Sequence, residues 1–372
     1  MRTKQITRLF FLCLFVLGTS HQDCLAQTQG DSDDPIVSVL RKPHLKILHI
    51  GNSYTFDAVS FLPSILNNNN VDISDLCIYR TMRAGGSFKM WYDIYHDNDH
   101  EYYYQIEKVC GGIDANISTG DGSVGDGSLF RKALTDEQWD IITIQQSSAY
   151  APYYEQWGGQ GPGGYLNELL GLIKQLQPHA VIGMMLVHSY ASNYSGNVEQ
   201  SSLERWKLIV ASLEKCCADY GIKLVIPYGT AIQNLRASSL NNDADLTYDG
   251  VHCDYVLGRY TATCCYFETI IKPRTGISIL GDKTRINTLW LPDPSSAVPV
   301  DENTAPIAQK AAILAVNDRL HCSNPEDNEA TSIVSPHRQT ATNDEEYTLT
   351  GLKVRTHSKG IYIKNGQKRL RN

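Results

Sequence analysis

Short apolar runs alternate with amphipathic stretches along most of this chain. The apolar runs predict β-strands over residues 45–50, 73–79, 141–144, 181–187 and 224–227. The amphipathic stretches, in which apolar residues recur at helical spacing, predict helices over residues 61–66, 165–176, 203–220, 256–271 and 307–320. Apolar strands that alternate with helices are typical of a mostly parallel sheet with helices on both faces. We therefore predict an α/β fold around a mostly parallel, five-stranded sheet.

Two aromatic-rich segments interrupt this alternation. Residues 88–138 contain Trp91, several tyrosines and a Gly/Asp/Ser run, and residues 150–164 contain Trp157 followed by Gly/Pro turns. Each segment is long for a plain connection and could shape a substrate site, with rings that suit stacking on a sugar. Each could equally be a surface excursion with its aromatic rings buried beneath it. The sequence leaves both interpretations open.

The two ends of the chain differ in composition from its centre. Residues 1–26 carry basic residues, an apolar run over 9–18 and small residues before Gln27, which is typical of a signal peptide. We therefore predict an exported protein in the periplasm, on the cell surface or secreted, with no membrane-spanning helix. Residues 323–345 are rich in Ser, Thr, Asn, Asp, Glu and Pro, as in a linker that follows a main domain over residues 44–322.

The C-terminal tail, residues 346–372, alternates like a small β-hairpin with an Asn-Gly turn. It resembles the end of the C-terminal sorting domains used by the type IX secretion route of some Gram-negative bacteria. It is shorter than a full domain of that kind, so a sorting signal and a purely structural tail both remain open.

Charge and cysteine content narrow the function classes. The net charge of −7 and the charged fraction of 20% do not favour binding to nucleic acid or to an anionic membrane. Ten cysteines less the two in the predicted leader leave eight, an even number that permits disulfides in an exported chain. Spacing does not reveal their pairing, and the vicinal pairs at 216–217 and 264–265 favour core packing. No Cys/His cluster has zinc spacing, so we expect no metal or other cofactor.

Three residues at distant positions can form a nucleophile and its base. Ser53 follows Gly51 at the end of the first predicted strand, where a tight turn can expose its hydroxyl beside a histidine. If Asp249 and His252 open a helix that continues through Arg259, the carboxylate can orient the imidazole and leave Nε2 facing the serine. Taken separately, the serine could instead cap a helix, and the aspartate could cap another beside an incidental histidine.

A serine hydrolase also needs hydrogen-bond donors for the negative oxygen of its acyl-transfer intermediate. Gly85 and Gly86 follow the second predicted strand, and glycine lets a backbone N–H approach a substrate closely. Gln145 and Gln146 end the third predicted strand, and a glutamine amide is a side-chain donor. Both pairs lie at carboxyl ends of strands, where α/β sheets bind ligands. A simple turn and a polar strand end are the alternative interpretations.

With these motifs in this order, residues 44–322 resemble an SGNH (GDSL-like) hydrolase. The resemblance is carried by Gly51-Asn52-Ser53-Tyr54, Ala84-Gly85-Gly86-Ser87, the segment around Gln145-Gln146, and Asp249-Gly250-Val251-His252. Asn52 stands where Asp is usual in that family, a change that we expect to be peripheral to the triad. The family's Gly-x-Asn-Asp is absent from the third segment. The resemblance implies a flavodoxin-like three-layer α/β/α sandwich.

The resemblance further implies a serine esterase, which the signal peptide predicted above would export. It assigns the catalytic triad to Ser53, Asp249 and His252. It assigns the oxyanion hole to Ser53, Gly86 and Gln146. Gly85 and Gln145 remain open alternatives to the last two. The resemblance also implies acyl esters on small molecules or polysaccharides as substrates. Export and the aromatic segments favour acetyl esters on carbohydrate among them. The altered third segment leaves a second hypothesis, a catalytically impaired carbohydrate-binding protein on the same scaffold.

Overall fold

The computed structural model describes residues 34–96, 103–122, 127–158, 164–195, 200–287 and 297–327. For residues 121–122, 346–348, 360–364 and 367–371 it describes the backbone alone. The chain divides into two compact units, Met1–Ala330 and Thr331–Asn372. The predicted signal peptide, residues 1–26, and most of the predicted linker, residues 323–345, lie outside the described residues.

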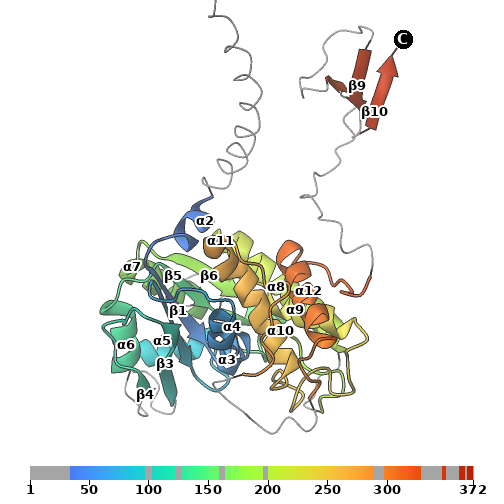
Figure 1. The fold of residues 1–372 in the computed structure, drawn as a ribbon. Helices are drawn as coiled ribbons and strands as arrows, with labels where there is room; N and C mark the ends of the chain where they lie inside the picture. The colour runs from blue at the N-terminus through green and yellow to red at the C-terminus, as the bar shows by residue number, and fades with distance from the viewer. Residues whose placement is uncertain are drawn as a thin grey trace, which may run out of the picture. The chain divides into compact units, whose positions relative to one another are not determined.

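A seven-stranded sheet forms the centre of the first unit, in the strand order β4-β3-β2-β1-β5-β6-β7 (Figure 1). Its strands are β1 (Leu45–Gly51), β2 (Leu76–Met82), β3 (Tyr104–Gly111), β4 (Gly120–Gly122), β5 (Ile141–Ile144), β6 (Val181–Met185) and β7 (Leu224–Ile226). Strands β2, β1, β5, β6 and β7 run parallel, whereas β3 and β4 pair antiparallel. The parallel strands follow the flavodoxin-like order, so the predicted fold class is confirmed.

The sheet has two strands more than the five predicted. Both additional strands, β3 and β4, come from the aromatic-rich segment 88–138. In β3 the polar side chains of Gln105, Glu107 and Lys108 interrupt the buried positions, because this strand lies near the edge of the sheet. β4 has only three residues, two of them glycine. Neither strand therefore has the continuous apolar run that identifies the parallel strands in the sequence.

Helices cover both faces of the sheet (Figure 1). They are α2 (Pro35–Leu40), α3 (Ser53–Val59), α4 (Leu62–Asn68), α5 (Phe88–His96), α6 (Ser128–Thr135), α7 (Tyr165–Leu176), α8 (Ser202–Tyr220), α9 (Tyr228–Arg236), α10 (Leu257–Tyr266), α11 (Lys272–Thr275) and α12 (Thr304–Asn317). A 3₁₀ turn, η1 (Tyr154–Gln156), precedes α7, and a π-helical segment, η2 (Phe267–Ile271), follows α10. Helix α10 packs against α3, α9 and α12, while α5, α6 and α7 pack against one another.

Alternating side chains of β3 show that α3 and α6 lie on opposite faces of the sheet. The hydroxyl of Tyr104 accepts a hydrogen bond from the N–H of Phe130 in α6. Glu107, an odd number of residues later and therefore on the other face, pairs with Arg80 of β2. The guanidinium of Arg80 lies over the ring of Phe56 in α3. The residues at the start of α3 therefore lie in the helix layer opposite α6.

The aromatic rings of the two interrupting segments are mostly part of the core. Trp91, Tyr104 and Trp157 are almost fully buried, with 0%, 1% and 3% of their surface exposed. The indole N–H of Trp91 donates to the carbonyl of Gly51, at the end of β1. Of the two interpretations left open by the sequence, burial therefore holds for these rings. Tyr150, which is 43% exposed, is an exception.

The cysteines of the described residues pack as thiols. All eight are free, and all but Cys322 are buried. The sequence permitted disulfides, but these cysteines instead pack as free thiols, and both vicinal pairs lie in the core. Within the described ranges, no helix is long and apolar enough to cross a membrane.

The second unit contains a three-stranded antiparallel sheet in the order β10-β9-β8. Its strands are β8 (Glu346–Thr348), β9 (Gly360–Lys364) and β10 (Gln367–Arg371). Strands β9 and β10 pair with Gln367 opposite Lys364, on either side of the predicted Asn-Gly turn. The sorting role of this tail stays a prediction.

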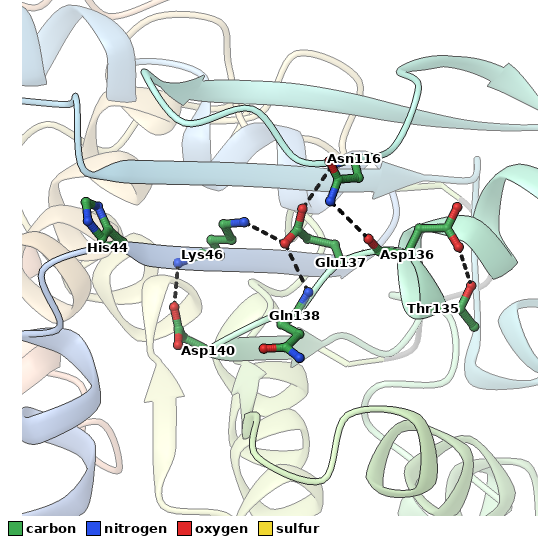
Figure 2. Close-up of a pocket in the computed structure, with 8 residues that line it drawn as sticks. All are labelled: His44, Lys46, Asn116, Thr135, Asp136, Glu137, Gln138 and Asp140. Atoms are coloured by element: carbon green, nitrogen blue, oxygen red, sulfur yellow. Dashed lines mark hydrogen bonds and ion pairs between the residues drawn. The ribbon is translucent and has the colours of Figure 1, made fainter.

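A polar cavity of about 560 Å³ lies at the amino ends of the parallel strands (Figure 2). Glu137 accepts hydrogen bonds from the ammonium of Lys46 at 2.5 Å and from the N–H groups of Asn116 and Gln138 at 2.9 and 3.0 Å. Asp140 accepts the N–H of Lys46 at 2.8 Å. Because the chain's own donors already satisfy these carboxylates, the cavity is best explained as a structural ion-pair network.

Replacing Glu137 with Gln should lower the free energy of unfolding by about 2 kcal/mol at pH 7, because Lys46 loses its charged partner. Burial alone would raise the pKa of the Glu137 carboxyl, but hydrogen bonds from Lys46, Asn116 and Gln138 hold it below its usual value. A depressed pKa stabilises the folded state above the unfolded-state pKa, and this contribution is lost as the pH falls. The deficit of Glu137→Gln, measured by urea unfolding, should therefore shrink below about pH 4.

Asp136→Asn is the matched control, because the neighbouring carboxylate is exposed and should contribute little to stability. A deficit of Glu137→Gln that is equally large at pH 7 and at acidic pH would contradict the ion-pair account.

Candidate active site

Ser53 begins helix α3 directly after β1, at the position that the sequence predicts for a nucleophile. The N-cap of this helix is Asn52, whose side-chain oxygen accepts a hydrogen bond from the N–H of Tyr54 at 2.9 Å. The capping role that the sequence allowed for Ser53 therefore belongs to its neighbour. The hydroxyl of Ser53 is left for another partner, beside the unpaired N–H groups that every helix start presents.

Asp249 and His252 lie in a loop between α9 and α10, and not at a helix start as predicted. Helix α10 begins only at Leu257. Gly250 has a φ of +82°, in the left-handed region that glycine tolerates, so a helix cannot run through this position. Oδ1 of Asp249 accepts the N–H groups of Val251 and His252 at 2.9 and 2.7 Å and closes the turn itself. The turn still brings the two side chains together, so the error concerns only the local backbone.

The structure joins Ser53, His252 and Asp249 in one hydrogen-bonded chain. Oγ of Ser53 lies 2.7 Å from Nε2 of His252, and Nδ1 of His252 lies 2.7 Å from Oδ2 of Asp249. Burial alone would raise the pKa of Asp249, but hydrogen bonds from the backbone N–H and the imidazole of His252 hold it below its usual value. Asp249 is thus a carboxylate at neutral pH and fixes the Nδ1–H tautomer, so Nε2 can accept the serine proton.

The glycine pair after β2 differs in how its two N–H groups are used. The N–H of Gly86 donates to the carbonyl of Arg83 at 2.8 Å and closes a turn. Its carbonyl accepts a hydrogen bond from the side chain of Asn52 at 3.0 Å. Gly85 has a φ of +63°, and its N–H makes no hydrogen bond within the part of the chain that the structure describes. This bonding argues against Gly86, the predicted oxyanion donor, and favours the open alternative Gly85.

The two glutamines after β5 also differ in how their side-chain amides are bonded. The amide of Gln145 is fully buried; its nitrogen donates to Oδ1 of Asn52 at 2.6 Å, and its oxygen accepts the hydroxyl of Thr55 at 3.3 Å. The side-chain oxygen of Gln146 accepts the N–H groups of Ser147 at 2.8 Å and of the first residue of α5 at 3.4 Å. The amide nitrogen of Gln146 donates no hydrogen bond among the described residues. Gln146 is therefore the glutamine with a donor left for a ligand.

Asn52 is a central residue of the site, although its difference from the family pattern was expected to be peripheral. Its oxygen receives the N–H of Tyr54 and the amide of Gln145, and its nitrogen donates to the carbonyl of Gly86. One buried side chain therefore connects helix α3 with the segments that follow β2 and β5. These are the three segments that supply the candidate nucleophile and oxyanion donors.

A cavity of about 710 Å³ opens beside Ser53. Its walls come from α3, β2, β3 and the start of β4. Phe56 and Met82 provide apolar surface, while Arg80 and Glu107 form an ion pair in the wall. A cavity of this size, with a few polar groups among apolar ones, is typical of a small-molecule site.

Two further side chains of α3 reach the loop around His252: Tyr54, which ends the first motif but was assigned no role, and Asp57, which belongs to no motif. The hydroxyl of Tyr54 donates to the carbonyl of Val251 at 2.6 Å. The carboxylate of Asp57 accepts the N–H of Cys253 at 3.1 Å. The one available signal in the sequence is a charge one helical turn after the candidate nucleophile, in a helix whose other positions are mostly buried.

Residues 46–278 match the model of a family described as "Domain of unknown function (DUF4886)". A DUF4886 family protein from Bacteroides uniformis ATCC 8492 is 26% identical, with 76% of this chain and 98% of that chain covered and a TM-score of 0.59.

Two more distant solved structures are also similar. A presumptive acylhydrolase from Bacteroides fragilis NCTC 9343 is 12% identical, with 68% of this chain and 94% of that chain covered and a TM-score of 0.34. A presumptive GDSL-like lipase from Parabacteroides merdae ATCC 43184 is 15% identical, with 62% of this chain and 98% of that chain covered and a TM-score of 0.38. No curated protein matches the sequence.

Proposed function

This chain belongs to the DUF4886 family, and we propose that it is a serine ester hydrolase of the SGNH type. The observation that carries this proposal is the chain of two 2.7 Å contacts from Ser53 through His252 to Asp249. A serine hydroxyl becomes a nucleophile when a base takes its proton, and the base must be held in one tautomer. Both conditions are met by side chains that lie almost 200 residues apart in the sequence.

In the proposed reaction, Ser53 Oγ attacks the carbonyl carbon of an ester while Nε2 of His252 takes its proton. The resulting imidazolium is stabilised by the carboxylate of Asp249 and then protonates the departing alcohol. Water, deprotonated by the same nitrogen, attacks the acyl-serine and releases the carboxylic acid. The serine proton returns from His252, and the enzyme is restored.

Each tetrahedral intermediate places a negative charge on the former carbonyl oxygen. We assign three donors to this oxyanion: the N–H of Ser53 at the start of α3, the N–H of Gly85, and the side-chain amide of Gln146. Gly85 replaces Gly86 in this proposal because the N–H of Gly86 already bonds the carbonyl of Arg83. Donors that are fixed before the reaction stabilise the charge without reorganisation.

The proposed substrates are acyl esters on carbohydrate, acetyl esters in particular. A cavity of about 710 Å³ is far larger than an acetyl group requires, so it would hold the alcohol part of such an ester. The guanidinium groups of Arg80 and Arg259 already lie over the ring of Phe56. Contacts to a sugar would therefore fall to Glu107, whose side chain is 39% exposed and can accept hydrogen bonds from hydroxyl groups. The burial of Trp91 and Trp157 weakens the aromatic support that the sequence offered for this class, although Tyr103 and Tyr150 remain exposed. Export, predicted from residues 1–26, would place the enzyme among extracellular or periplasmic glycans.

The rival hypothesis, a carbohydrate-binding protein that has lost catalysis, rested on the altered third segment. The amide nitrogen of Gln146 makes no hydrogen bond within the described ranges, so this segment still offers a donor. An assembled triad with an open donor favours the enzyme over the binding protein.

Ser53→Ala should reduce the rate of 4-nitrophenyl acetate hydrolysis by at least about 10³-fold, because the nucleophile is removed. Ser60→Ala, in the turn that ends the same helix, is the matched control and should retain activity. Both purified variants are assayed by the release of 4-nitrophenolate. The release of acetate from acetylated xylan is measured in parallel. A Ser53→Ala variant that hydrolyses at the wild-type rate would refute the proposal; carbohydrate binding without turnover by the wild-type protein would favour the rival.

Gln146→Glu should lower kcat by about 10²- to 10³-fold with little change in KM. The carboxylate keeps the oxygen that accepts the N–H of Ser147, but it replaces the amide donor with an oxygen that repels the oxyanion. Gln138→Glu introduces the same charge at an exposed position near the other end of the sheet and should leave kcat unchanged. Equal kcat values for the two variants would show that Gln146 is not an oxyanion donor.

A further inference from the structure

Helix α3 carries the nucleophile, and it also holds the loop that carries the base. This base loop, residues 247–254, lies between α9 and α10 and is closed by a bridge between Thr247 and Cys253. Two side chains of α3, Tyr54 and Asp57, contact it. They are three residues apart, so they lie on the same side of the helix.

The two contacts flank His252 on either side. The hydroxyl of Tyr54 donates to the carbonyl of Val251, the residue before His252, at 2.6 Å. Oδ2 of Asp57 accepts the N–H of Cys253, the residue after it, at 3.1 Å. The ring of Tyr54 also meets the imidazole edge-on, with 5.5 Å between centroids. The backbone on both sides of the base is therefore fixed to the helix that begins with Ser53.

The carboxylate of Asp57 is itself held rigidly. It is fully buried, and its Oδ1 accepts a hydrogen bond from Nε of Arg259 in α10 at 2.8 Å. A buried carboxylate needs such a partner, because an uncompensated charge in the interior is strongly destabilising. Asp57 therefore links three elements: the nucleophile helix, the base loop and α10.

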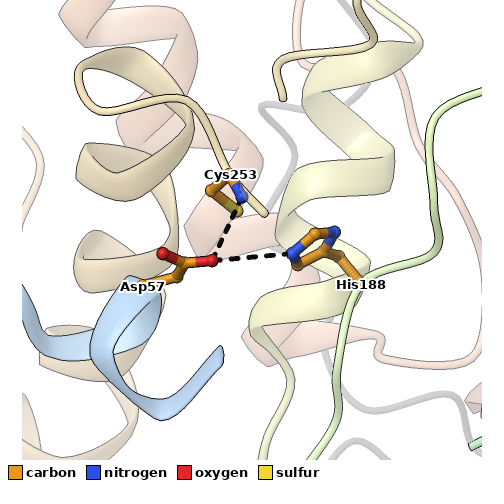
Figure 3. A group of neighbouring side chains, drawn as sticks. All are labelled: Asp57, His188 and Cys253. Atoms are coloured by element: carbon orange, nitrogen blue, oxygen red, sulfur yellow. Dashed lines mark hydrogen bonds and ion pairs between the residues drawn. The ribbon is translucent and has the colours of Figure 1, made fainter. Parts of the chain in front are cut away.

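Asp57, His188 and Cys253 also form a group whose side-chain types can bind metals, with ligand atoms within 4.8 Å of one another (Figure 3). Two observations favour a positioning role over a metal site. The guanidinium of Arg259 already occupies Oδ1 of Asp57, so a divalent cation would lie next to a fixed positive charge. The other oxygen of that carboxylate, Oδ2, already accepts the N–H of Cys253 at 3.1 Å.

His188 packs against Tyr54 and helps to hold its side chain in place. Its ring stacks on that of Tyr54, with 4.4 Å between centroids and 18° between planes. Nδ1 bonds the carbonyl of Ser189 at 2.9 Å, and Nε2 lies 3.9 Å from Oδ2 of Asp57, beyond hydrogen-bond distance. Burial lowers the pKa of His188, and the nearby carboxylate opposes this effect. The stacked imidazole thus keeps the hydroxyl of Tyr54 directed at the carbonyl of Val251.

We propose that Tyr54 and Asp57 are positioning residues that clamp the base loop to helix α3 and thereby set the distance between Ser53 and His252. This inference rests on the proposed function, in which these two residues are nucleophile and base. Neither clamp residue touches the reacting atoms. Their effect on the reaction is geometric, because a displacement of about 1 Å between reacting groups can cost about 100-fold in rate.

The test uses Tyr54→Phe and Asp57→Asn in the full-length protein, with two matched controls. Tyr228→Phe removes a hydroxyl from another fully buried tyrosine, one that has no hydrogen-bond partner among the described residues. Asp282→Asn removes the charge of another buried aspartate, whose partners include Asn69 and Tyr260 and not the base loop. Two readouts are compared: kcat and KM for 4-nitrophenyl acetate, and hydrogen–deuterium exchange of the base-loop amides.

We expect the two clamp variants to lower kcat by about 10- to 100-fold with KM nearly unchanged. They should also speed amide exchange over residues 251–254 by at least about 10-fold, while the control variants change neither quantity. Exchange that remains at the control level in both clamp variants would overturn the inference, whatever happens to kcat. If Asp57→Asn does not fold because Arg259 loses its partner, Tyr54→Phe alone decides.

The two proposals can fail separately. Faster exchange in the clamp variants of a protein that hydrolyses no ester would support the clamp and refute the esterase. Hydrolysis by the wild-type protein, with normal kcat and normal exchange in both clamp variants, would support the esterase and refute the clamp.

Discussion

The side chain of Asn52 joins three segments of the chain at the point where β1 ends and α3 begins. Its oxygen caps the helix by accepting a hydrogen bond from the N–H of Tyr54, and it accepts a second from the side-chain amide of Gln145. Its nitrogen donates a hydrogen bond to the carbonyl of Gly86. Each bond is buried, and a buried polar group that loses its partner costs about 1–3 kcal/mol. The direction of α3, the turn after β2 and the end of β5 are thus fixed by one amide. The proposed nucleophile and its oxyanion donors depend on this constraint, and the clamp from Tyr54 and Asp57 extends it to the base.

The two ends of the parallel strands serve different purposes in this protein. At the amino ends, carboxylates such as Glu137 and Asp140 are satisfied by the chain's own lysines and N–H groups. At the carboxyl ends, the N–H groups of Ser53 and Gly85 and the amide nitrogen of Gln146 donate no hydrogen bond among the described residues. Parallel α/β sheets bind ligands at the carboxyl ends of their strands, and the distribution of satisfied and open groups agrees with that rule. The same reasoning separates Gln145, whose amide is structural, from the neighbouring Gln146.

The sequence predicts the features that depend on strong local patterns. Five apolar runs identify the parallel strands, and the order of Ser53, the glycine pair, the glutamines and Asp249–His252 identifies one site. Features that depend on tertiary contacts are harder to predict from the sequence. Strands β3 and β4 are too polar or too short to stand out, and Gly250 gives the base loop a turn where helical spacing was expected. The choice between Gly85 and Gly86 depends on a single turn bond to Arg83, which no sequence pattern reveals.

Covalent labelling reports whether the neighbours of Ser53 activate its hydroxyl. A fluorophosphonate probe reacts with a serine that a neighbouring base has activated, and peptide mapping by mass spectrometry locates the adduct. We expect one adduct, on Ser53, in the folded protein, and none after denaturation. An adduct on a different serine, or no adduct in a preparation that hydrolyses 4-nitrophenyl acetate, would contradict the assignment of Ser53, His252 and Asp249 as the catalytic triad.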